Sequence, residues 1–387
     1  MFAILRNLPV RVCVLVSSLD ARSRSDSDGT YTREFEREVM LSSHEEEKLS
    51  RSQGNSDWVR VWLAFVCLVL IAMITVGGAT RLTHSGLSMV DWKPLSGVIP
   101  PVTVVEWQAE FEQYKQYPEY QKLNQGMSLE EFKGIFYWEY SHRVLGRGIG
   151  LLFFIPFVFF WWTQRVEKKY LPRLVGALIL GGSQGLMGWY MVKSGLVDLP
   201  RVSHYRLAAH LSLAMLILGY LFWLVLDLSS TFRERVTSML RKWVMGLVIL
   251  LSLQIVYGAF TAGLRAGLGF NTYPLMGQQL LADAATTIQP LWINFFENGA
   301  MVQFIHRWLG FTVLLSMAGV LIMAFIQPTS KRLRQAVTVT LSLVAVQFLL
   351  GVLTLINYVP LYLALAHQVF ACIVLLSMVY LLYIVRN

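Results

Sequence analysis

Eight separate stretches of apolar sequence are each long enough to cross a membrane as a helix. They cover residues 58–78, 144–162, 173–192, 207–228, 243–262, 302–326, 333–355 and 361–384. A helix needs about 20 apolar residues to cross the hydrocarbon of a bilayer. Because backbone amides in lipid must be bonded within their own segment, these stretches predict helices. The sequence therefore predicts an all-α integral membrane protein with eight transmembrane helices.

Composition supports a membrane-embedded chain and excludes a large soluble protein. Hydrophobic residues make up 55% of the 387 residues and charged residues 15%, whereas about a quarter of the residues in soluble domains are charged. The three cysteines, Cys13, Cys67 and Cys372, are scattered along the chain. Their spacing matches neither a disulfide framework nor a zinc motif.

Basic residues lie in alternate links between the predicted helices. The second, fourth and sixth links contain Arg165, Lys168, Lys169, Arg173, Arg233, Arg235, Arg241, Lys242, Lys331, Arg332 and Arg334. Because Lys and Arg accumulate in cytoplasmic loops, both termini are predicted on the cytoplasmic or matrix side, and the long segments 79–141 and 263–301 on the other side. We therefore attribute the net charge of +9 largely to basic residues that face the inner surface of a lipid bilayer. No nucleic acid is predicted as a partner.

Residues 1–57 form an N-terminal extension, which we predict to be disordered. Residues 1–24 are rich in arginine and serine, as transit peptides are, whereas the acid-rich residues 25–48 do not fit one. We predict a multi-pass protein of an inner membrane. The alternative start at Met40 and the segment 202–207 favour a bacterial cell membrane over a mitochondrial one.

Several short motifs occur twice in the same order. The duplicated motifs are His142-Arg143 with His306-Arg307, Gln184 and Gly188 with Gln347 and Gly351, Ala209-His210 with Ala366-His367, and Gly86-Leu87 with Gly267-Leu268. Each copy spans an even number of helices, so both copies have the same orientation in the membrane. The sequence therefore predicts two tandem parallel four-helix-bundle repeats, 58–228 and 243–387, joined by an inner linker, 229–242.

Four of the seven histidines belong to this repeat. His142 and His306 begin the second helix of each copy, and His210 and His367 lie near the start of the fourth. All four are therefore predicted at one membrane depth, as one facing pair in each bundle. Ionisable residues inside a membrane are costly and usually functional. A single histidine is as well explained by a hydrogen bond between helices, but two symmetric pairs are not.

Two imidazoles in a four-helix bundle suit the axial positions of a haem iron. Zinc needs three or four protein ligands, and copper would favour added Met or Cys. Arginines beside the histidines suit haem propionates, although snorkelling to the membrane surface explains them equally; they are Arg143, Arg147 and Arg307. Nearby glycines fit either a flat macrocycle or close helix packing; they are Gly146, Gly188, Gly310 and Gly351. We expect Gln184 and Gln347 to form hydrogen bonds between helices.

The two copies differ three residues before the first histidine of each pair. Glu139 precedes His142, whereas Gln303 precedes His306. This spacing places both side chains on one helix face. A carboxylate there can act as a base or stabilise a developing cation, although acids are also favoured at helix starts for structural reasons. The difference indicates one reactive pocket and one that only carries electrons.

The segment Glu139-Tyr140-Ser141-His142-Arg143 resembles the E-x-x-H-R element of the haem A synthases. The duplicated four-helix bundle and the segments 77–92, 189–195 and 205–210 are also similar to that family. The resemblance covers residues 58–384. Because neither long outer segment contains a cysteine, the chain resembles the mitochondrial and alphaproteobacterial type.

The resemblance implies an oxidoreductase that oxidises the C8 methyl group of haem O to a formyl group. The product, haem A, serves terminal oxidases such as cytochrome c oxidase. His142 and His210 would bind the substrate haem O, His306 and His367 would bind a resident haem B, and Glu139 would be the catalytic carboxylate. The implied partners are a haem O synthase that hands over the substrate and a ferredoxin-type electron donor.

Other functions remain open at this point. A dihaem b-type electron carrier would have the same histidines but no need for Glu139. A haem-transfer protein would bind haem without changing it, and a secondary transporter would place its site near the midplane of the membrane. The sequence leaves open whether the chain is a homo-oligomer, and it gives no role to the loop residues His84 and His204.

Overall fold

The computed structural model describes residues 57–90, 97, 99–195, 202–229 and 231–386. The predicted N-terminal extension therefore lies outside the described residues except for its last residue. Residues Val59–Asn387 form one compact unit. Within the described residues the structure is helical and has no strand, only an isolated bridge between Met276 and Gln279.

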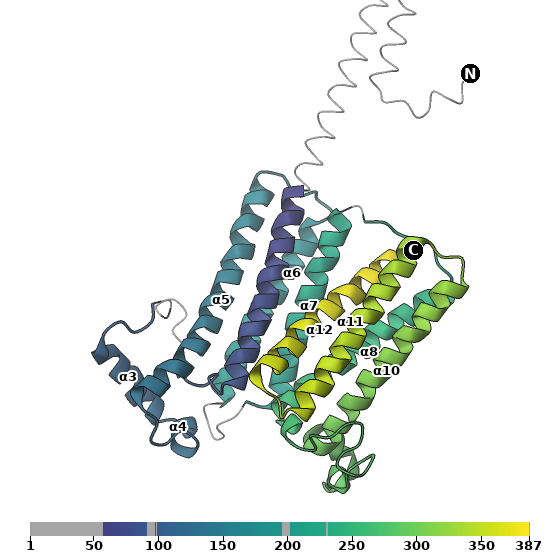
Figure 1. The fold of residues 1–387 in the computed structure, drawn as a ribbon. Coiled ribbons are helices and arrows are strands. Elements are labelled where there is room, and N and C mark those ends of the chain that lie inside the picture. Colours follow the sequence, from purple (N-terminus) through teal and green to yellow (C-terminus); the bar gives the residue numbers. More distant parts are fainter. Residues whose placement is uncertain (1–56, 91–96, 98, 196–201, 230, 387) are drawn as a thin grey trace, which may run out of the picture. The chain divides into compact units, whose positions relative to one another are not determined.

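Seven helices are long and apolar enough to cross a membrane (Figure 1). They are the first helix, Asp57–Leu82, then α5 (Leu129–Trp162), α7 (His204–Leu228), α8 (Ser238–Gly263), α10 (Gly299–Ile326), α11 (Lys331–Ile356) and α12 (Leu361–Ile384). Apart from the start of α5, their ends lie within a few residues of the predicted ones. The prediction of an all-helical membrane protein is confirmed at this level.

The remaining predicted span, 173–192, is the helix α6 (Leu171–Gly195). It is long enough to cross a membrane, but it is not among the seven helices that are also sufficiently apolar. Its glycines and the polar pair Ser183 and Gln184 lower its mean hydropathy. α6 nevertheless packs against α5 and α7 within the bundle.

Helix α5 begins well before the predicted span. Ser128 is its N-cap: the Ser128 hydroxyl accepts a hydrogen bond from the Glu131 amide, and Glu131 accepts one from the Ser128 amide. This capping box satisfies amides that a helix start leaves unpaired. The first turns of α5 then pack with α3 (Val104–Lys115) and α4 (Pro118–Lys122) around an aromatic core. This outer lobe was not predicted as helical.

The second outer segment is built differently. It consists of the short helices η3 (Ala266–Leu268), η4 (Asp283–Thr286), η5 (Leu291–Ile293) and α9 (Asn294–Glu297). Asn294 and Asn298 bond to each other and to loop carbonyls. Hydrogen bonds of side-chain amides thus stabilise this lobe, whereas packed aromatic rings stabilise the first one.

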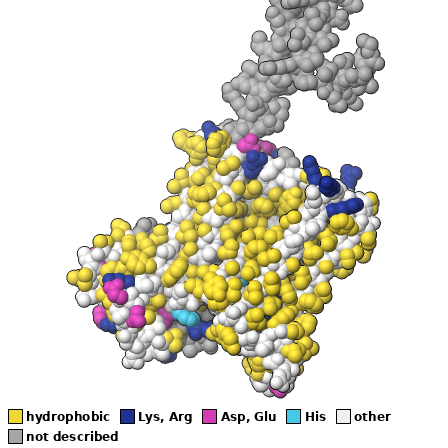
Figure 2. Space-filling view, in the orientation of Figure 1, with side chains coloured by type: hydrophobic (Ala, Val, Ile, Leu, Met, Phe, Trp, Pro, Cys, Tyr) yellow, Lys and Arg dark blue, Asp and Glu magenta, His cyan; other side chains and the backbone are white. Residues whose placement is uncertain are grey.

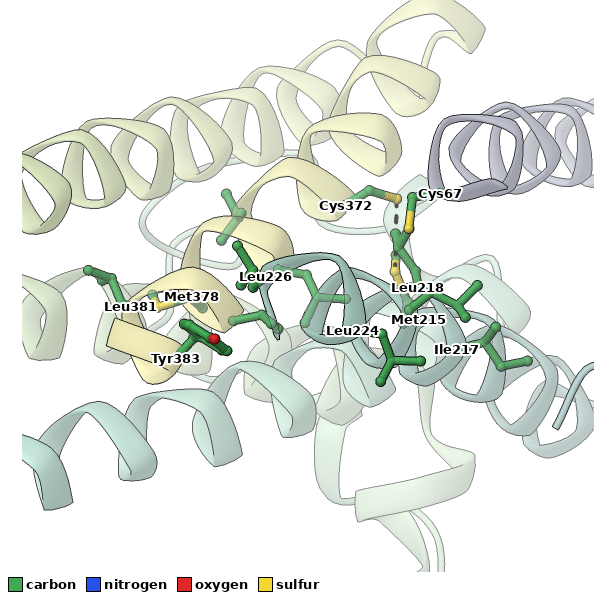
Figure 3. Close-up of a cluster of buried hydrophobic side chains, with 14 of the residues drawn as sticks. Cys67, Met215, Ile217, Leu218, Leu224, Leu226, Cys372, Met378, Leu381 and Tyr383 are labelled. Atoms are coloured by element: carbon green, nitrogen blue, oxygen red, sulfur yellow. Dashed lines mark hydrogen bonds between the residues drawn. The ribbon is translucent and has the colours of Figure 1, made fainter. Parts of the chain in front are cut away.

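The main core lies between the helices of the bundle (Figure 3). Cys67 and Cys372 are buried free thiols there, and the Cys372 Sγ lies 3.8 Å from the Met215 Sδ. Hydrophobic side chains also cover the visible sides of the bundle, and Lys and Arg gather at the end where the chain terminates (Figure 2). An apolar outside and an apolar core together are what a bilayer requires of a helical bundle.

Candidate haem-binding site

Each of the four repeated histidines packs against a glycine of a neighbouring helix. A methyl group on these glycines would lie 3.0 Å from His142 Nε2 at Gly77, 3.1 Å from His210 Cε1 at Gly188, 3.0 Å from His306 Cε1 at Gly258 and 2.8 Å from His367 Cε1 at Gly351. Real Cβ atoms rarely come so close to a neighbour, so glycine is required for each ring to rest against the next helix. The rings are therefore held in place by backbone.

The sequence identified only two of these glycines. Gly188 and Gly351 do face imidazoles, whereas Gly146 faces Met73 and Gly310 faces Gln254. Gly77 and Gly258 were missed as packing partners. Their signal was available, because Gly77 and Gly258 are separated by the same number of residues as the duplicated pair Gly86 and Gly267.

The histidines form two pairs. His142 on α5 and His210 on α7 are close enough for their charges to interact, and so are His306 on α10 and His367 on α12. Glutamine side chains bond to the backbone of the ligand-bearing helices: Gln184 Nε2 donates to the His210 carbonyl at 3.1 Å, Gln347 Nε2 to the His367 carbonyl at 3.0 Å and Gln254 Nε2 to the His306 carbonyl at 3.1 Å. The predicted hydrogen bonds of Gln184 and Gln347 between helices are confirmed.

Several imidazole nitrogens lack a protein partner. The Nδ1 atoms of His210, His306 and His367 are buried without a hydrogen bond, although buried polar atoms are nearly always bonded. Within the described ranges, no three His, Cys, Asp or Glu side chains gather as a bare metal site. Paired imidazoles with unsatisfied nitrogens fit a haem iron, whose remaining ligands come from its own macrocycle.

Glu139 is buried in the outer lobe and fully bonded. Its Oε2 accepts hydrogen bonds from the Ser88 hydroxyl and the Met89 amide, both at 2.8 Å. Its Oε1 accepts one from Arg143 Nη2 at 2.5 Å. Arg143 also donates to the Met89 carbonyl at 2.7 Å. Glu139 and Arg143 therefore hold the chain that follows the first helix.

The second copy repeats this clamp with the opposite polarity. Gln303 Nε2 donates to the carbonyls of Ala266 and Gly269 at 2.9 and 2.7 Å. Arg307 Nη2 donates to the Phe270 carbonyl at 2.5 Å and to Gln303 Oε1 at 3.1 Å. The Glu139 carboxylate thus accepts hydrogen bonds from its loop, whereas the Gln303 side-chain amide donates hydrogen bonds to the corresponding loop.

The three arginines predicted beside the histidines all bond to loop carbonyls. Besides the bonds above, Arg147 Nη1 donates to the Gly97 carbonyl at 3.1 Å, and Arg307 Nη1 donates to those of Thr272 and Leu275. They position the loops that follow the first helix of each half. Contact with a propionate stays a prediction for all three.

Of the two histidines predicted in outer loops, His84 does lie in the turn after the first helix, whereas His204 is the buried first residue of α7. His84 Nδ1 lies 3.1 Å from Arg265 Nη2, and both residues have left-handed backbone, with φ of 55° and 53°. Burial, then Arg265 and Arg81, lower the pKa of His84. His204 Nε2 lies 3.8 Å from Glu297 Oε2. Both contacts therefore join a residue before α8 to one after it.

A second buried carboxyl was missed by the sequence. Glu119 on α4 is 6% exposed, and the Tyr114 hydroxyl donates to its Oε2 at 3.3 Å. Asn124 Nδ2 in turn donates to the Tyr114 oxygen at 2.7 Å. Burial and the charge of Glu139 raise the pKa of Glu119 to about 8. Both acids of the described second outer lobe, Asp283 and Glu297, are exposed instead.

Comparison with known proteins adds independent information. Residues 60–379 match a family described as cytochrome oxidase assembly protein, COX15-CtaA. A protein named Heme A synthase from Chelativorans is 46% identical over 325 residues, 84% of this chain and 90% of the relative. A protein of the same name from Agrobacterium fabrum is 46% identical over 85% of this chain and 91% of the relative. Another, from Parvibaculum lavamentivorans, is 49% identical over 69% of this chain and 78% of the relative.

Proposed function

The chain belongs to the COX15-CtaA family of cytochrome oxidase assembly proteins, and from this premise we infer that it is a haem A synthase, an oxidoreductase that converts haem O into haem A. The C8 methyl group of haem O would be the group that is oxidised to a formyl. The observation that carries this function to the chain's own residues is the pair of histidine–glycine pockets, of which only one has a buried carboxylate beside it.

We propose that all eight helices span the membrane as two tandem four-helix repeats. The proposed repeats are 58–228 and 243–387, joined by the linker 229–242. The support is that three kinds of pocket element have counterparts: a glycine behind each imidazole, a glutamine on the backbone of His210 and of His367, and an arginine on each loop. One element differs, because Gln254, which bonds to the His306 carbonyl, has Met73 in its place in the first half. On this proposal α6 crosses the membrane with α5 and α7, and its lower hydropathy reflects the small and polar residues of the pocket.

His142 and His210 are proposed to hold the substrate haem O, and His306 and His367 a resident haem B. The first pocket lies under the lobe that buries Glu119 and Glu139, and charge in a site shielded from water acts strongly on a reacting group. The second pocket has Gln303 in place of Glu139 and so lacks the carboxylate that the proposed oxidation needs. A pocket without that carboxylate suits a resident haem B, which would supply electron-transfer chemistry.

Glu139 is proposed to be the catalytic carboxylate. Ser88, Met89 and Arg143 fix both of its oxygens, so its negative charge is preorganised. It can stabilise positive charge that develops on the substrate or accept a proton from it. The same bonds also fit a purely structural clamp, as the counterpart Gln303 shows, and the haem products of a Glu139→Gln variant separate the two roles.

Partners and location are proposed from the same premise. The substrate would come from a haem O synthase and the electrons from a ferredoxin-type donor. Both termini are proposed on the cytoplasmic or matrix side of an inner membrane, because the end of the bundle that carries the C-terminus is rich in Lys and Arg (Figure 2). Reporter fusions after Asn387 and within 276–280 should report opposite sides.

The test is the haem content of the protein. We would express it in a host that makes haem O but has no haem A synthase of its own, extract the haems and separate them by chromatography with mass spectrometry. Haem A or its hydroxylated precursor together with haem B is expected. Haem B alone, with haem O available in the membrane, would favour a dihaem electron carrier instead.

A further inference from the structure

Gln368 joins the two halves of the bundle at a point between the two histidine pairs. It follows His367 on α12, and its Nε2 donates to the backbone carbonyl of Ile74 on the first helix at 2.6 Å. Ile74 lies one helical turn before Gly77, the glycine that packs against His142. The contact therefore connects a ligand-bearing helix of the second half to the helix behind a ligand of the first.

Two consecutive glycines make this contact possible. Gly77 lies against the His142 ring, with the ring Nε2 at 3.0 Å from the place of a Cβ, while a Cβ on Gly78 would collide with Gln368 Oε1. The Gln368 amide is therefore packed directly on the backbone of the first helix. The connection from His367 to His142 thus consists of the Gln368 hydrogen bond to the first helix and the packing of that helix, at Gly77, against the His142 ring.

The opposite crossing between the halves is apolar. Leu211 follows His210 as Gln368 follows His367, and it packs against an apolar cluster that includes Ala208 and Ala259. A leucine side chain cannot donate a hydrogen bond. Of the two residues that follow these equivalent histidines, Gln368 bonds to the backbone of the other half and Leu211 does not.

This inference rests on the two-haem function proposed above. We propose that Gln368 is a positioning residue for electron exchange between the haems of the two pockets. It fixes the contact between the helices across which one electron passes. In such an exchange one haem would lose the electron that the other gains, and no bond would be formed or broken. Electrons enter from a one-electron donor of the iron–sulphur protein class. Electron exchange between fixed centres depends steeply on their separation and contact, so a helix–helix contact beside both ligands controls it.

The test measures exchange in the protein with both haems bound. A photoreduced flavin supplies less than one electron per chain, and freeze-quench electron paramagnetic resonance follows the two ferric signals, which are assigned with a His306→Ala variant. The exchange phase is the one whose rate does not depend on protein concentration. Gln368→Leu keeps the side-chain size and removes the bond, and we expect a clear loss of rate in this phase relative to the wild-type protein.

Tyr383→Phe is the matched control. Tyr383 also lies on α12 and donates a hydrogen bond across to Asp227 of α7 at 3.1 Å, but it does so at the end of α12 far from His367, so the exchange rate should not change. If Gln368→Leu loses a haem, Gly78→Ala provides the second variant, because its methyl displaces the Gln368 side chain and should slow the same phase. Unchanged exchange in a variant that keeps both haems overturns the proposal, as does a wild-type protein with both haems and no exchange phase. A wild-type protein without two haems contradicts the proposed function instead.

Discussion

Glu139 and Gln303 hold equivalent loops but bond to them in opposite senses. The Glu139 carboxylate accepts from a hydroxyl and an amide, whereas the Gln303 amide donates to two carbonyls. The second half shows that a glutamine beside an arginine is compatible with this fold. A glutamine at position 139 would meet one unfavourable contact, its NH₂ group against the Met89 amide, at a cost of about 1–3 kcal/mol.

We therefore expect Glu139→Gln to keep both haems and to lose catalysis. The loss of product should be roughly a hundredfold to ten-thousandfold, the usual contribution of a positioned acid or base. Haem extraction after growth on a haem O background measures it, and Gln303→Glu is the matched variant. Normal haem A production by Glu139→Gln would leave Glu139 as a loop clamp only.

Glu119 gives the outer lobe a dependence on pH. Its pKa is raised to about 8 by burial first and by Glu139 second, and Tyr114 and Arg265 lower it. In an unfolded lobe the carboxyl would titrate near its usual value of about 4.3. The folded lobe thus binds a proton that the unfolded lobe releases, so stability falls as pH rises between these two values and levels off above the higher one.

Glu119→Gln should remove this dependence, because glutamine mimics the protonated acid at every pH. The wild-type protein should lose on the order of 1 kcal/mol per unit of pKa difference across this window, and the variant should be the more stable of the two at pH 9. Limited proteolysis of the outer lobe between pH 5 and 9 measures the difference. Equal slopes for both proteins would show that Glu119 does not stay protonated in the folded lobe.

Two glycines of helix α6 have different surroundings. A methyl on Gly188 would lie 3.1 Å from His210, whereas a methyl on Gly182 would meet nothing within 4 Å. Gly188→Ala should lower haem affinity in the first pocket by roughly ten- to a hundredfold, because overpacking costs about 1–3 kcal/mol. Gly182→Ala should keep the haem and stabilise the helix by about 0.5–1 kcal/mol. Spectrophotometric haem titration distinguishes them, and equal affinities would argue against the histidine–glycine packing.

The elements that the sequence predicted best are those whose signal is local. Apolar length alone placed seven of the helices, since the bilayer sets that length. It placed α6 as well, although glycines and Gln184 weaken its signal. The outer lobes were missed because their structure depends on contacts between distant segments, such as Met89 with Glu139. Glu119 resembles an ordinary solvent-exposed acid in the first turn of a short helix, and only the fold buries it.

Across the whole molecule, one carboxylate ties four segments together at the end opposite the histidine pockets. Asp227, at the end of α7, accepts hydrogen bonds from Arg173 of α6 at 2.7 Å, from Tyr383 of α12 at 3.1 Å, and from Arg386. Arg233 of the linker lies at 3.5 Å. The Asp227 side chain is 8% exposed, whereas the side chains of Arg173 and Arg233 are both 49% exposed. The carboxylate is thus buried beneath partly exposed arginines, and its contacts join both halves of the sequence.

Asp227→Asn should destabilise the bundle without emptying the pockets. It leaves three arginines without their shared counter-ion, and the loss of the charge of a buried carboxylate that accepts charge-assisted hydrogen bonds costs about 1–3 kcal/mol. The control is Glu167→Gln, which breaks an exposed ion pair with Lys169 at 2.7 Å and should cost well under 1 kcal/mol. Thermal unfolding in detergent compares the two, with the haem spectrum at low temperature as the check on the pockets. Because α7 carries His210 near one end and Asp227 at the other, a lower melting temperature with an intact spectrum would show that the two ends of this helix serve separate purposes. Equal melting of both variants would show that the arginines are held by other groups.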